Sequence, residues 1–350
     1  MNQDPKKESP KENKPEGKKP SLLLRILKII VIILLIVILA VGAVLLHPLL
    51  ELHDHTKVAG SADWMTKLDD GLRLSEVNIP GTHNSGTQYV DLMFFSRCQS
   101  MSVKEQLEAG YRYLDIRVGV TEPGGELVLM HGFTVCRPSY FTRKPLLLRT
   151  VVEECAQFLA KHPTETVLFV VKHEHGDIST ADMERKIDEI VTGAPGQLWY
   201  EGDTLPTVGE ARGKIVLLRR YADDAGIGAR AGIDAYWNDQ GGVGDNGEYN
   251  MMGSDGLLWV QDRYEYDTED KWAAFLEALE EPLDPEDVGI HFLSTKGTLA
   301  YGHPAFFARR LNKRLLKQDL PPQSEGHFGW VIVDFGTAEL AAHIYGTMFD

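Results

Sequence analysis

The chain has 350 residues, a formal net charge of −15 and a hydrophobic fraction of 43%. Residues 61–350 are enough for one large domain, such as a barrel, or for two smaller ones. The acidic balance argues against nucleic acid as a partner.

Two N-terminal segments differ from the rest of the chain. Residues 1–20 are mostly Lys, Glu and Pro, so we expect a disordered tail. Residues 29–50 contain no charged side chain, and 22 such residues can cross a bilayer as a helix. We therefore expect residues 21–50 to form a transmembrane signal anchor. A cleaved signal peptide is the alternative, but its apolar region is usually only about 7–15 residues long.

The charges before the apolar segment predict its orientation. Eight basic and four acidic residues precede it, which gives that end a net charge of +4 and leaves −19 for the remainder. The positive-inside rule keeps the basic end in the cytoplasm. We therefore expect the globular part outside the cell, tethered as a single-pass membrane protein.

Three cysteines complete the compositional picture. Cys155 lies on the apolar face of a predicted helix over 147–161, where a buried thiol is expected. Cys98 and Cys136 lie in predicted loops, and in an oxidising exterior they could form a disulfide, which sequence alone leaves open. No cysteine or histidine spacing indicates a zinc site.

Strand-like and helix-like segments alternate after the anchor. The apolar, strand-like segments are 74–80, 113–118, 126–131, 166–172, 214–219, 257–262, 289–294 and 329–335. The amphipathic, helix-like segments are about 101–109, 147–161, 180–192, 270–280, 304–317 and 337–347. This alternation predicts an α/β fold of parallel βα units. Eight strands favour a closed barrel, and the helix missing between the second and third predicts an irregular one.

Polar residues lie at or just past the ends of seven of these segments: His83, Arg117, His131, Lys172, Arg220, Asp262 and Asp334. A charge inside a barrel strand is costly, whereas barrel enzymes build their sites at strand C-termini. Each residue alone also has an ordinary explanation, since Asp334 could cap the last helix and Arg117 could pair with Asp115. Their joint placement predicts one shared site.

The residue types in this set suit cleavage of a phosphodiester. One histidine can act as a base while another, protonated, acts as an acid. Arginine presents a planar fork to phosphate oxygens, and a carboxylate behind a histidine fixes its tautomer. Cations can then hold the charge that develops on phosphorus oxygens.

Seven motifs in order resemble bacterial phosphatidylinositol-specific phospholipase C: IPGTHNSGT, YRYLDIRVG, LVLMHG, FLAKHPTETVLFVVKHE, ARGKIVLLRRY, VQDRY and GWVIVDF. The resemblance runs from about Trp64 to the C-terminus. It implies a distorted TIM-like (β/α)8 barrel over 61–350. It also implies cleavage of phosphatidylinositol, or a glycosylphosphatidylinositol-like glycolipid, to diacylglycerol and a cyclic inositol phosphate.

The resemblance also implies roles for individual residues. His83 would be the general base for the inositol 2-hydroxyl, supported by Asp334, and His131 the general acid. Arg117 would contact the phosphate. Positions that would bind inositol hydroxyls or line the pocket are Lys172, Arg220, Asp262, Tyr264 and Asp115. Intramolecular attack by the hydroxyl explains why no nucleophilic Ser or Cys is needed.

We expect catalysis without a metal or any other cofactor. One branch of the family binds calcium through Asn and acidic residues, and in the other an arginine replaces the metal. Arg117 and Lys172 stand where the calcium branch needs acids, and calcium requires six to eight oxygens. Asn84 and Asp115 could supply only two.

Asn84 departs from the metal-free pattern, in which an aspartate follows the first histidine. An asparagine keeps the shape and loses the charge, so Arg117 would lack its partner unless Asp115 compensates. Two alternatives therefore stay open: a barrel that binds inositol or glycan headgroups without turnover, and a phosphodiesterase for another phosphodiester. We expect a monomer.

Aromatic and apolar residues in the loops near the site give a further open choice. Met93, Phe94, Phe95, Phe133, Tyr140 and Phe141 could enter lipid or pack beneath the loops.

Overall fold

The computed structural model describes residues 21–50, 56–194, 197–228, 232–241, 247–252, 256–298 and 302–349. The chain divides into two compact units, Met1–His47 and Pro48–Asp350. The tail expected to be disordered, residues 1–20, lies outside the described residues.

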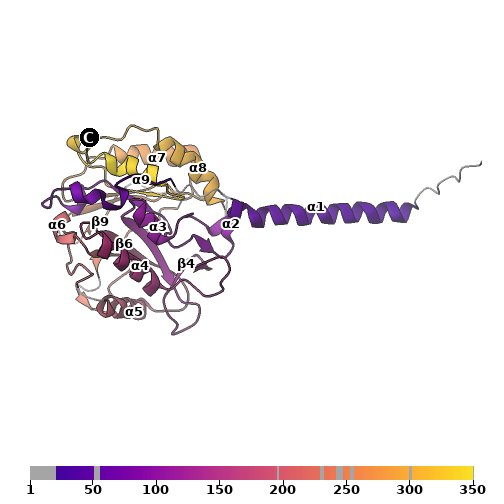
Figure 1. Cartoon of the computed structure of the whole chain (residues 1–350), viewed down its shortest axis with the longest axis horizontal. Coiled ribbons are helices and arrows are strands. Elements are labelled where there is room, and N and C mark those ends of the chain that lie inside the picture. The colour runs from indigo at the N-terminus through magenta and orange to yellow at the C-terminus, as the bar shows by residue number, and fades with distance from the viewer. Residues whose placement is uncertain are drawn as a thin grey trace, which may run out of the picture. The chain divides into compact units, whose positions relative to one another are not determined.

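Helix α1, Leu22–Leu50, dominates the first unit (Figure 1). Its stretch Leu22–Val44 is long and apolar enough to cross a membrane, and none of it is buried within the protein. A core helix of a soluble domain would bury at least one face. A membrane span or a signal sequence both fit this helix.

The second unit is built on eight parallel strands. In spatial order they are β8 (Ile233–Asp234), β7 (Ile215–Arg219), β6 (Val167–His175), β3 (Tyr113–Gly119), β1 (Ile79–Thr82), β12 (Trp330–Val333), β11 (Val288–Phe292) and β10 (Gly256–Gln261). β9, Gly247–Met252, pairs antiparallel with β10 and contacts β8, with no ladder between β8 and β9 among the described residues. The fold is thus a distorted TIM-like barrel, as expected.

The third expected strand, 126–131, is not a barrel strand. β4, Val128–His131, pairs antiparallel with the far end of β3, and it continues through β5, Thr134–Arg137, to β2, Tyr89–Val90. The eighth parallel strand is instead β8, whose two residues are too short to give a periodic pattern. Because β3 and β4 are antiparallel, a direct connection joins them, and no crossover helix is needed between them.

The first expected strand begins later than its sequence pattern suggested. Leu74–Glu76 form a 3-10 turn, and β1 starts only at Ile79 and continues through Pro80 and Gly81 to Thr82. Pro80 is tolerated because the ladder from β1 to β3 starts only at Gly81. Gly81 is required because a Cβ there would lie 2.5 Å from the Ile332 side chain.

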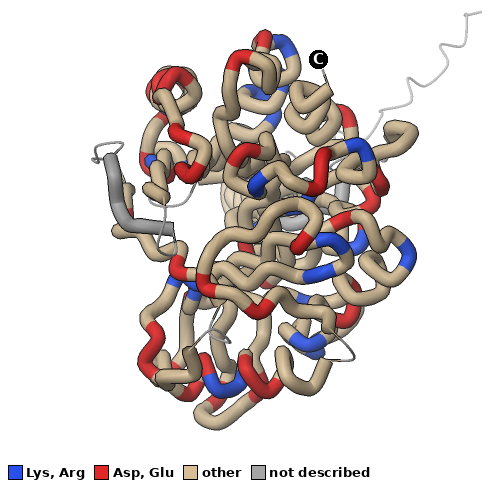
Figure 2. Tube along the Cα trace, turned by 90° about the vertical axis from the view of Figure 1, so that its left-hand side faces the viewer, with Lys and Arg blue, Asp and Glu red and all other residues tan. Residues whose placement is uncertain are grey.

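The described residues form eight α-helices after α1, of which six follow the expected amphipathic segments and two, α2 and α6, were not expected. They are α2 (Met93–Ser96), α3 (Val103–Glu108), α4 (Leu148–Lys161), α5 (Thr180–Gly193), α6 (Val208–Ala211), α7 (Thr268–Leu279), α8 (Pro304–Leu315) and α9 (Ala338–Gly346). Side-chain oxygens of Ser102, Ser179 and Asp267 cap the N-termini of α3, α5 and α7. Figure 1 shows α7, α8 and α9 grouped on one side of the strands, and α4 and α5 on another. Acidic and basic positions are interspersed along the elements of this unit (Figure 2).

Alternation along the strands separates the interior of the barrel from its helical coat. On β6, Leu168 and Val170 join the interior cluster, whereas Val167, Phe169 and Val171 pack in the cluster that includes α4 and α5. On β7, Val216 and Leu218 likewise belong to the interior. The same two-residue steps, continued past the hydrophobic residues, reach Lys172 on β6 and Arg220 after β7. The register of the core therefore delivers polar side chains to the mouth of the barrel.

Candidate active site

A cavity of about 590 Å³ opens at the C-terminal ends of the barrel strands. Seven of the predicted site residues line it: His83, Arg117, His131, Lys172, Asp262, Tyr264 and Asp334. The other three, Asn84, Asp115 and Arg220, are at least nine-tenths buried and contact the lining residues. All ten predicted residues thus gather at one place.

His83 is oriented by a carboxylate. Its Nδ1 lies 2.7 Å from Asp334 Oδ1, so the ring donates its Nδ1 proton to Asp334 and leaves Nε2 free of a proton. Strands β1 and β12 are neighbours in the barrel, which brings together two residues that are 251 positions apart. A histidine held in this tautomer can accept a proton at Nε2.

His131 faces His83 from the other side, with the two ring centroids 6.1 Å apart. Its Nδ1 lies 2.7 Å from the carbonyl oxygen of Ser96, which accepts a hydrogen bond from the Nδ1–H group. The Nε2 atom of His131 is therefore the nitrogen that can exchange a proton with a ligand. Burial first, and then the nearby His83 and Arg117, lower the pKa of His131 below its ordinary value. An anionic ligand beside it would oppose this effect and favour the protonated form.

Arg117 is held by two carboxylates. Its Nε donates to Asp115 Oδ2 at 3.1 Å, and its Nη1 lies 3.5 Å from Glu174 Oε1. Burial alone would raise the pKa of Asp115, but Arg117, His83 and Arg220 together keep it well below its usual range. Asp115 therefore gives Arg117 the negatively charged partner that the neutral Asn84 cannot provide.

Glu174 was missed by the sequence reasoning, although it lies on β6 two residues after Lys172. Its carboxylate lies 3.6 Å from Lys172 Nζ and accepts the backbone N–H of Gly132 at 2.8 Å. Burial opposes its ionisation, yet Arg117 and Lys172 lower the pKa of Glu174 to about 2. The two-residue period along a strand puts Glu174 on the same face as Lys172, and this signal could have found it.

The opposite wall is formed by residues after β8 and β10, including Asp239, Asp262 and Tyr264, and the buried Arg220 contacts it. Arg220 stacks its guanidinium 3.4 Å from the ring centroid of Trp237 and lies 3.7 Å from Asp262 Oδ2. Tyr264 donates its hydroxyl to Asp239 at 2.9 Å, and Lys296 Nζ lies 5.4 Å from the centroid of the Tyr264 ring. Cationic and anionic groups thus alternate around this wall.

Asn84 adopts the left-handed conformation, with φ 46°. Asn and Asp tolerate this region better than most residues do. Its backbone N–H donates to Asp115 Oδ2 at 3.1 Å, and its side-chain amide lies 3.2 Å from His83 Nε2. An amide that donates to Nε2 stabilises neutral His83, whereas an aspartate would stabilise the protonated form.

Gln99 is a second residue that the sequence did not reveal. It is fully buried, and its side-chain nitrogen donates to the carbonyl oxygens of His83 at 2.8 Å and Val333 at 2.9 Å. It thereby ties together the ends of β1 and β12. A glutamine in an irregular loop gives no pattern from which this contact could have been predicted.

The cysteines do not form the disulfide that we considered. Cys98, Cys136 and Cys155 are all free and buried. Cys98 lines the cavity, with its Sγ 3.8 Å from His131 Nδ1, and burial raises the pKa of its thiol. Cys155 lies on the buried face of α4, as expected.

Of the aromatic and apolar loop residues that could either enter lipid or pack beneath the loops, some are exposed and some are partly buried. Phe141, Phe133, Tyr140 and Phe95 are exposed, with Phe141 at 95%. Met93 and Phe94 are partly buried, and Phe94 stacks on His303 with centroids 4.2 Å apart. Phe133 and Phe141 are therefore the residues best placed to meet lipid.

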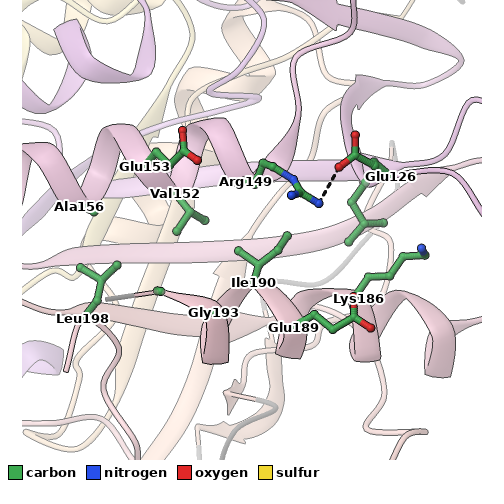
Figure 3. Close-up of a pocket in the computed structure, with 12 residues that line it drawn as sticks. Glu126, Arg149, Val152, Glu153, Ala156, Lys186, Glu189, Ile190, Gly193 and Leu198 are labelled. Atoms are coloured by element: carbon green, nitrogen blue, oxygen red, sulfur yellow. Dashed lines mark ion pairs between the residues drawn. The ribbon is translucent and has the colours of Figure 1, made fainter. Parts of the chain in front are cut away.

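A second cavity, of about 440 Å³, lies between α4 and α5 (Figure 3). Val152, Ile190 and Leu198 line it, and an ion pair between Arg149 and Glu126 spans 2.6 Å beside them. None of the ten predicted site residues lines this cavity. Its groups offer no acid–base pair comparable to the two histidines at the barrel mouth.

The surroundings of Asn84 fit a calcium ion poorly. Asp115 Oδ2 already accepts from Arg117 and from the Asn84 backbone, and its Oδ1 lies 3.9 Å from Arg220 Nη1. A cation placed at Asp115 would meet two guanidinium groups. Calcium also requires more oxygen ligands than these residues supply.

Comparison with known proteins agrees with this geometry. Residues 72–221 match the family model of the phosphatidylinositol-specific phospholipase C X domain. The 1-phosphatidylinositol phosphodiesterase of Staphylococcus aureus strain Newman is 27% identical over 293 residues, which cover 78% of this chain and 88% of the relative. That of Listeria monocytogenes is 31% identical over 165 residues, covering 44% of this chain and 47% of the relative.

Solved structures extend the similarity to the whole barrel. A phosphatidylinositol-specific phospholipase C from S. aureus superposes with a TM-score of 0.67 at 25% identity, covering 82% of this chain and 97% of that one. The L. monocytogenes enzyme has the same fold, with a TM-score of 0.59 at 22% identity. The second unit is thus similar in sequence and fold to bacterial phosphatidylinositol-specific phospholipases C, and residues 72–221 match their X domain.

Proposed function

We propose that this protein is a membrane-anchored phosphodiesterase that cleaves phosphatidylinositol, or a glycolipid with the same headgroup linkage, to diacylglycerol and inositol 1,2-cyclic phosphate. The similarity to bacterial 1-phosphatidylinositol phosphodiesterases supports the activity. The cyclic product and the roles of individual residues rest on the arrangement of the site.

One observation carries the mechanism. Two histidines that line the cavity lie next to each other, with ring centroids 6.1 Å apart. The Nδ1 of each forms a hydrogen bond to an acceptor, which is Asp334 for His83 and the Ser96 carbonyl for His131. His131 therefore offers its Nε2 to a substrate, and His83 Nε2 becomes available when the substrate hydroxyl displaces the Asn84 amide 3.2 Å away. A pair of this kind can take a proton on one side of a phosphorus atom and give one on the other.

The reaction then follows from the groups in place. His83 Nε2 takes the proton of the inositol 2-hydroxyl, whose oxygen attacks phosphorus within the same molecule. The bond from phosphorus to the diacylglycerol oxygen breaks as His131 Nε2 donates a proton to that oxygen. Arg117 and Lys172 stabilise the charge on the remaining phosphate oxygens.

The cations also argue for catalysis without a metal. Arg117 is oriented by Asp115 on one edge and Glu174 on the other, which leaves part of its guanidinium for the phosphate. Such a fixed cation supplies the charge that calcium would supply elsewhere. Asp262 and Tyr264, on the opposite wall, would bind inositol hydroxyls, with the buried Arg220 pairing with Asp262.

The anchor gives the enzyme its proximity to lipid. α1 is apolar over Leu22–Val44, and basic residues outnumber acidic ones before it, which supports an N-terminus in the cytoplasm and a barrel outside the cell. With the barrel strongly acidic, attraction to anionic lipid is not available to hold it at the surface. A tether replaces that attraction.

The test is turnover by the full-length protein in mixed micelles of detergent and phosphatidylinositol, with EDTA present. Phosphorus NMR should show inositol 1,2-cyclic phosphate as the first product. A requirement for added calcium would refute the metal-free mechanism. Activity of His83→Ala equal to wild type would refute the site assignment.

A headgroup binder without turnover remains the competing function. It predicts saturable binding of phosphatidylinositol with no product. In that case Asn84→Asp should create activity in an otherwise complete site.

A further inference from the structure

We propose that His83, Cys98 and Asp334 form a binding site for a thiophilic divalent cation such as Zn²⁺, and that occupation of this site switches the enzyme off. The binding part of this inference stands on the geometry alone. The inhibition rests on the function proposed above.

Three side chains of metal-binding type converge at this point. One ring nitrogen of His83, the Cys98 sulfur and one Asp334 oxygen all lie within 4.8 Å of one another. They come from three separate segments: the loop after β1, the loop after α2, and the end of β12. All three line the cavity at the barrel mouth, so an ion in solution can reach them.

The distances suit a tetrahedral ion after a small adjustment. Zinc binds sulfur at about 2.3 Å and nitrogen or oxygen at about 2.0–2.2 Å, so neighbouring ligand atoms lie roughly 3.3–3.8 Å apart. The widest pair has to close by about 1 Å on that basis. The His83–Asp334 pair, now 2.7 Å apart, opens slightly as the ion replaces the shared proton.

The backbone around the three ligands is already fixed. The Cys98 N–H donates to Thr87 Oγ1 at 3.0 Å, and the Cys98 carbonyl accepts the N–H of Phe335 at 2.6 Å. Gln99, the next residue, donates to the carbonyls of His83 and Val333. Residues 98–99 are therefore hydrogen-bonded to the end of β1, next to the ligand His83, and to the end of β12, next to the ligand Asp334.

The donor set matches zinc in charge and in kind. A thiolate, a carboxylate and a neutral imidazole carry two negative charges, which balance the ion. Sulfur and imidazole prefer zinc or cadmium to calcium or magnesium. Binding releases the Cys98 thiol proton to solvent and leaves the single imidazole proton on the nitrogen that does not bind. A water molecule completes the fourth position.

Occupation of this site would stop the proposed reaction. The ion takes the carboxylate that orients His83 and binds the ring that must accept the substrate proton. Arg117 and His131 do not bind the ion, although His131 Nδ1 lies 3.8 Å from the Cys98 sulfur. The expected behaviour is activity in EDTA, loss of activity on addition of zinc, and recovery when EDTA is added again.

Cobalt separates binding from activity. Full-length protein titrated with Co²⁺ should develop sulfur-to-cobalt charge-transfer absorption, which requires a thiolate ligand. The band should persist in Cys136→Ser/Cys155→Ser, where Cys98 is the remaining thiol, and disappear in Cys98→Ser. Because the double variant retains all three ligands, the experiment remains decisive even if Cys98→Ser does not fold.

Zinc inhibition gives the second readout. The zinc concentration for half inhibition, measured against each variant's own uninhibited rate, should rise at least about 10-fold in Cys98→Ser, since even outer-shell partners contribute 10- to 100-fold to metal affinity. It should be unchanged in Cys136→Ser. Absence of the cobalt band from the double variant, or equal inhibition of Cys98→Ser and wild type, would overturn the proposal. A cobalt band without phosphodiesterase activity would instead count against the proposed function alone.

Discussion

Two buried arginines at opposite ends of β3 show how the same chemistry serves two purposes. Arg112, just before the strand, and Arg117, near its C-terminal end, both pair with buried carboxylates. Arg112 donates to Glu165 at 2.7 and 3.0 Å, and to the carbonyls of Leu107, Tyr111, Ser61 and Ala62. All of its donors are directed inward, at protein atoms.

The network around Arg117 is incomplete by comparison. Asp115 Oδ1, Arg220 Nη1 and the Tyr113 hydroxyl are buried and have no hydrogen-bond partner among the described residues, although the first two atoms lie 3.9 Å apart. Such groups are costly unless something pairs with them. A saturated network stabilises the barrel, whereas an unsaturated one beside a cavity is prepared for a polar ligand. The contrast gives a way to separate stability from function.

The largest effect is expected from Arg112→Met. It leaves Glu165 buried without its cation, and loss of one partner of a buried pair costs about 3–5 kcal/mol of unfolding free energy. Urea unfolding followed by tryptophan fluorescence measures this loss. Turnover per folded molecule should be unchanged. A variant as stable as wild type would show that the satisfied network is dispensable.

Arg117→Lys should reverse that pattern. Lysine keeps the charge but not the fork that reaches Asp115, Glu174 and a phosphate together, so turnover should fall about 10²- to 10³-fold. Stability against urea should stay close to wild type, because the cation still compensates the two carboxylates. Equal losses of turnover and stability would erase the distinction between the two arginines.

Asn84→Asp adds a carboxylate to the unsaturated network. The left-handed backbone accepts either residue, so the change tests charge rather than conformation. A carboxylate beside His83 stabilises the positive charge that the ring gains as it takes the substrate proton, and about 1.4 kcal/mol of transition-state stabilisation corresponds to about 10-fold in rate. Initial rates on phosphatidylinositol should rise accordingly. A decrease would mean that repulsion from Asp115 outweighs this gain.

Glu174→Gln should produce the smallest effect, a shift in pH dependence. His131 must be protonated to act as the acid, so kcat/KM falls as pH rises through its pKa, which lies below 6.5 in the free protein. Glu174 raises the pKa of His131 and is itself ionised throughout this range, since its own pKa is about 2. Its removal should therefore move the alkaline limb to lower pH, by less than about one unit.

The shift is measured by comparing kcat/KM as a function of pH for wild type and Glu174→Gln, across the pH range in which histidine titrates. Glu189→Gln, on the outer helix α5 away from the barrel mouth, is a matched control that removes the same charge. An alkaline limb that moves to higher pH in Glu174→Gln would contradict the assignment of His131 as the acid.

The repeating pattern along the chain determined much of this protein. The succession of strand-like and helix-like segments predicted the barrel. The position of polar residues at strand ends predicted Arg117 and Lys172 at its mouth, and the family resemblance implied Asp115 there. These features are local, because a strand's alternation fixes which side chains face inward. The apolar run of α1 is local in the same sense.

Only the tertiary structure decided what lies across from what. Contacts between distant segments determine the antiparallel β4 that carries His131 and the two-residue β8. They also determine the hydrogen bonds of Gln99 to His83 and Val333, and the approach of Cys98 to His83 and Asp334. Loops that hold such residues carry no periodic signal. Their positions follow from the packing of the barrel as a whole, so the sequence could name the acid–base groups but not the thiol that lies beside them.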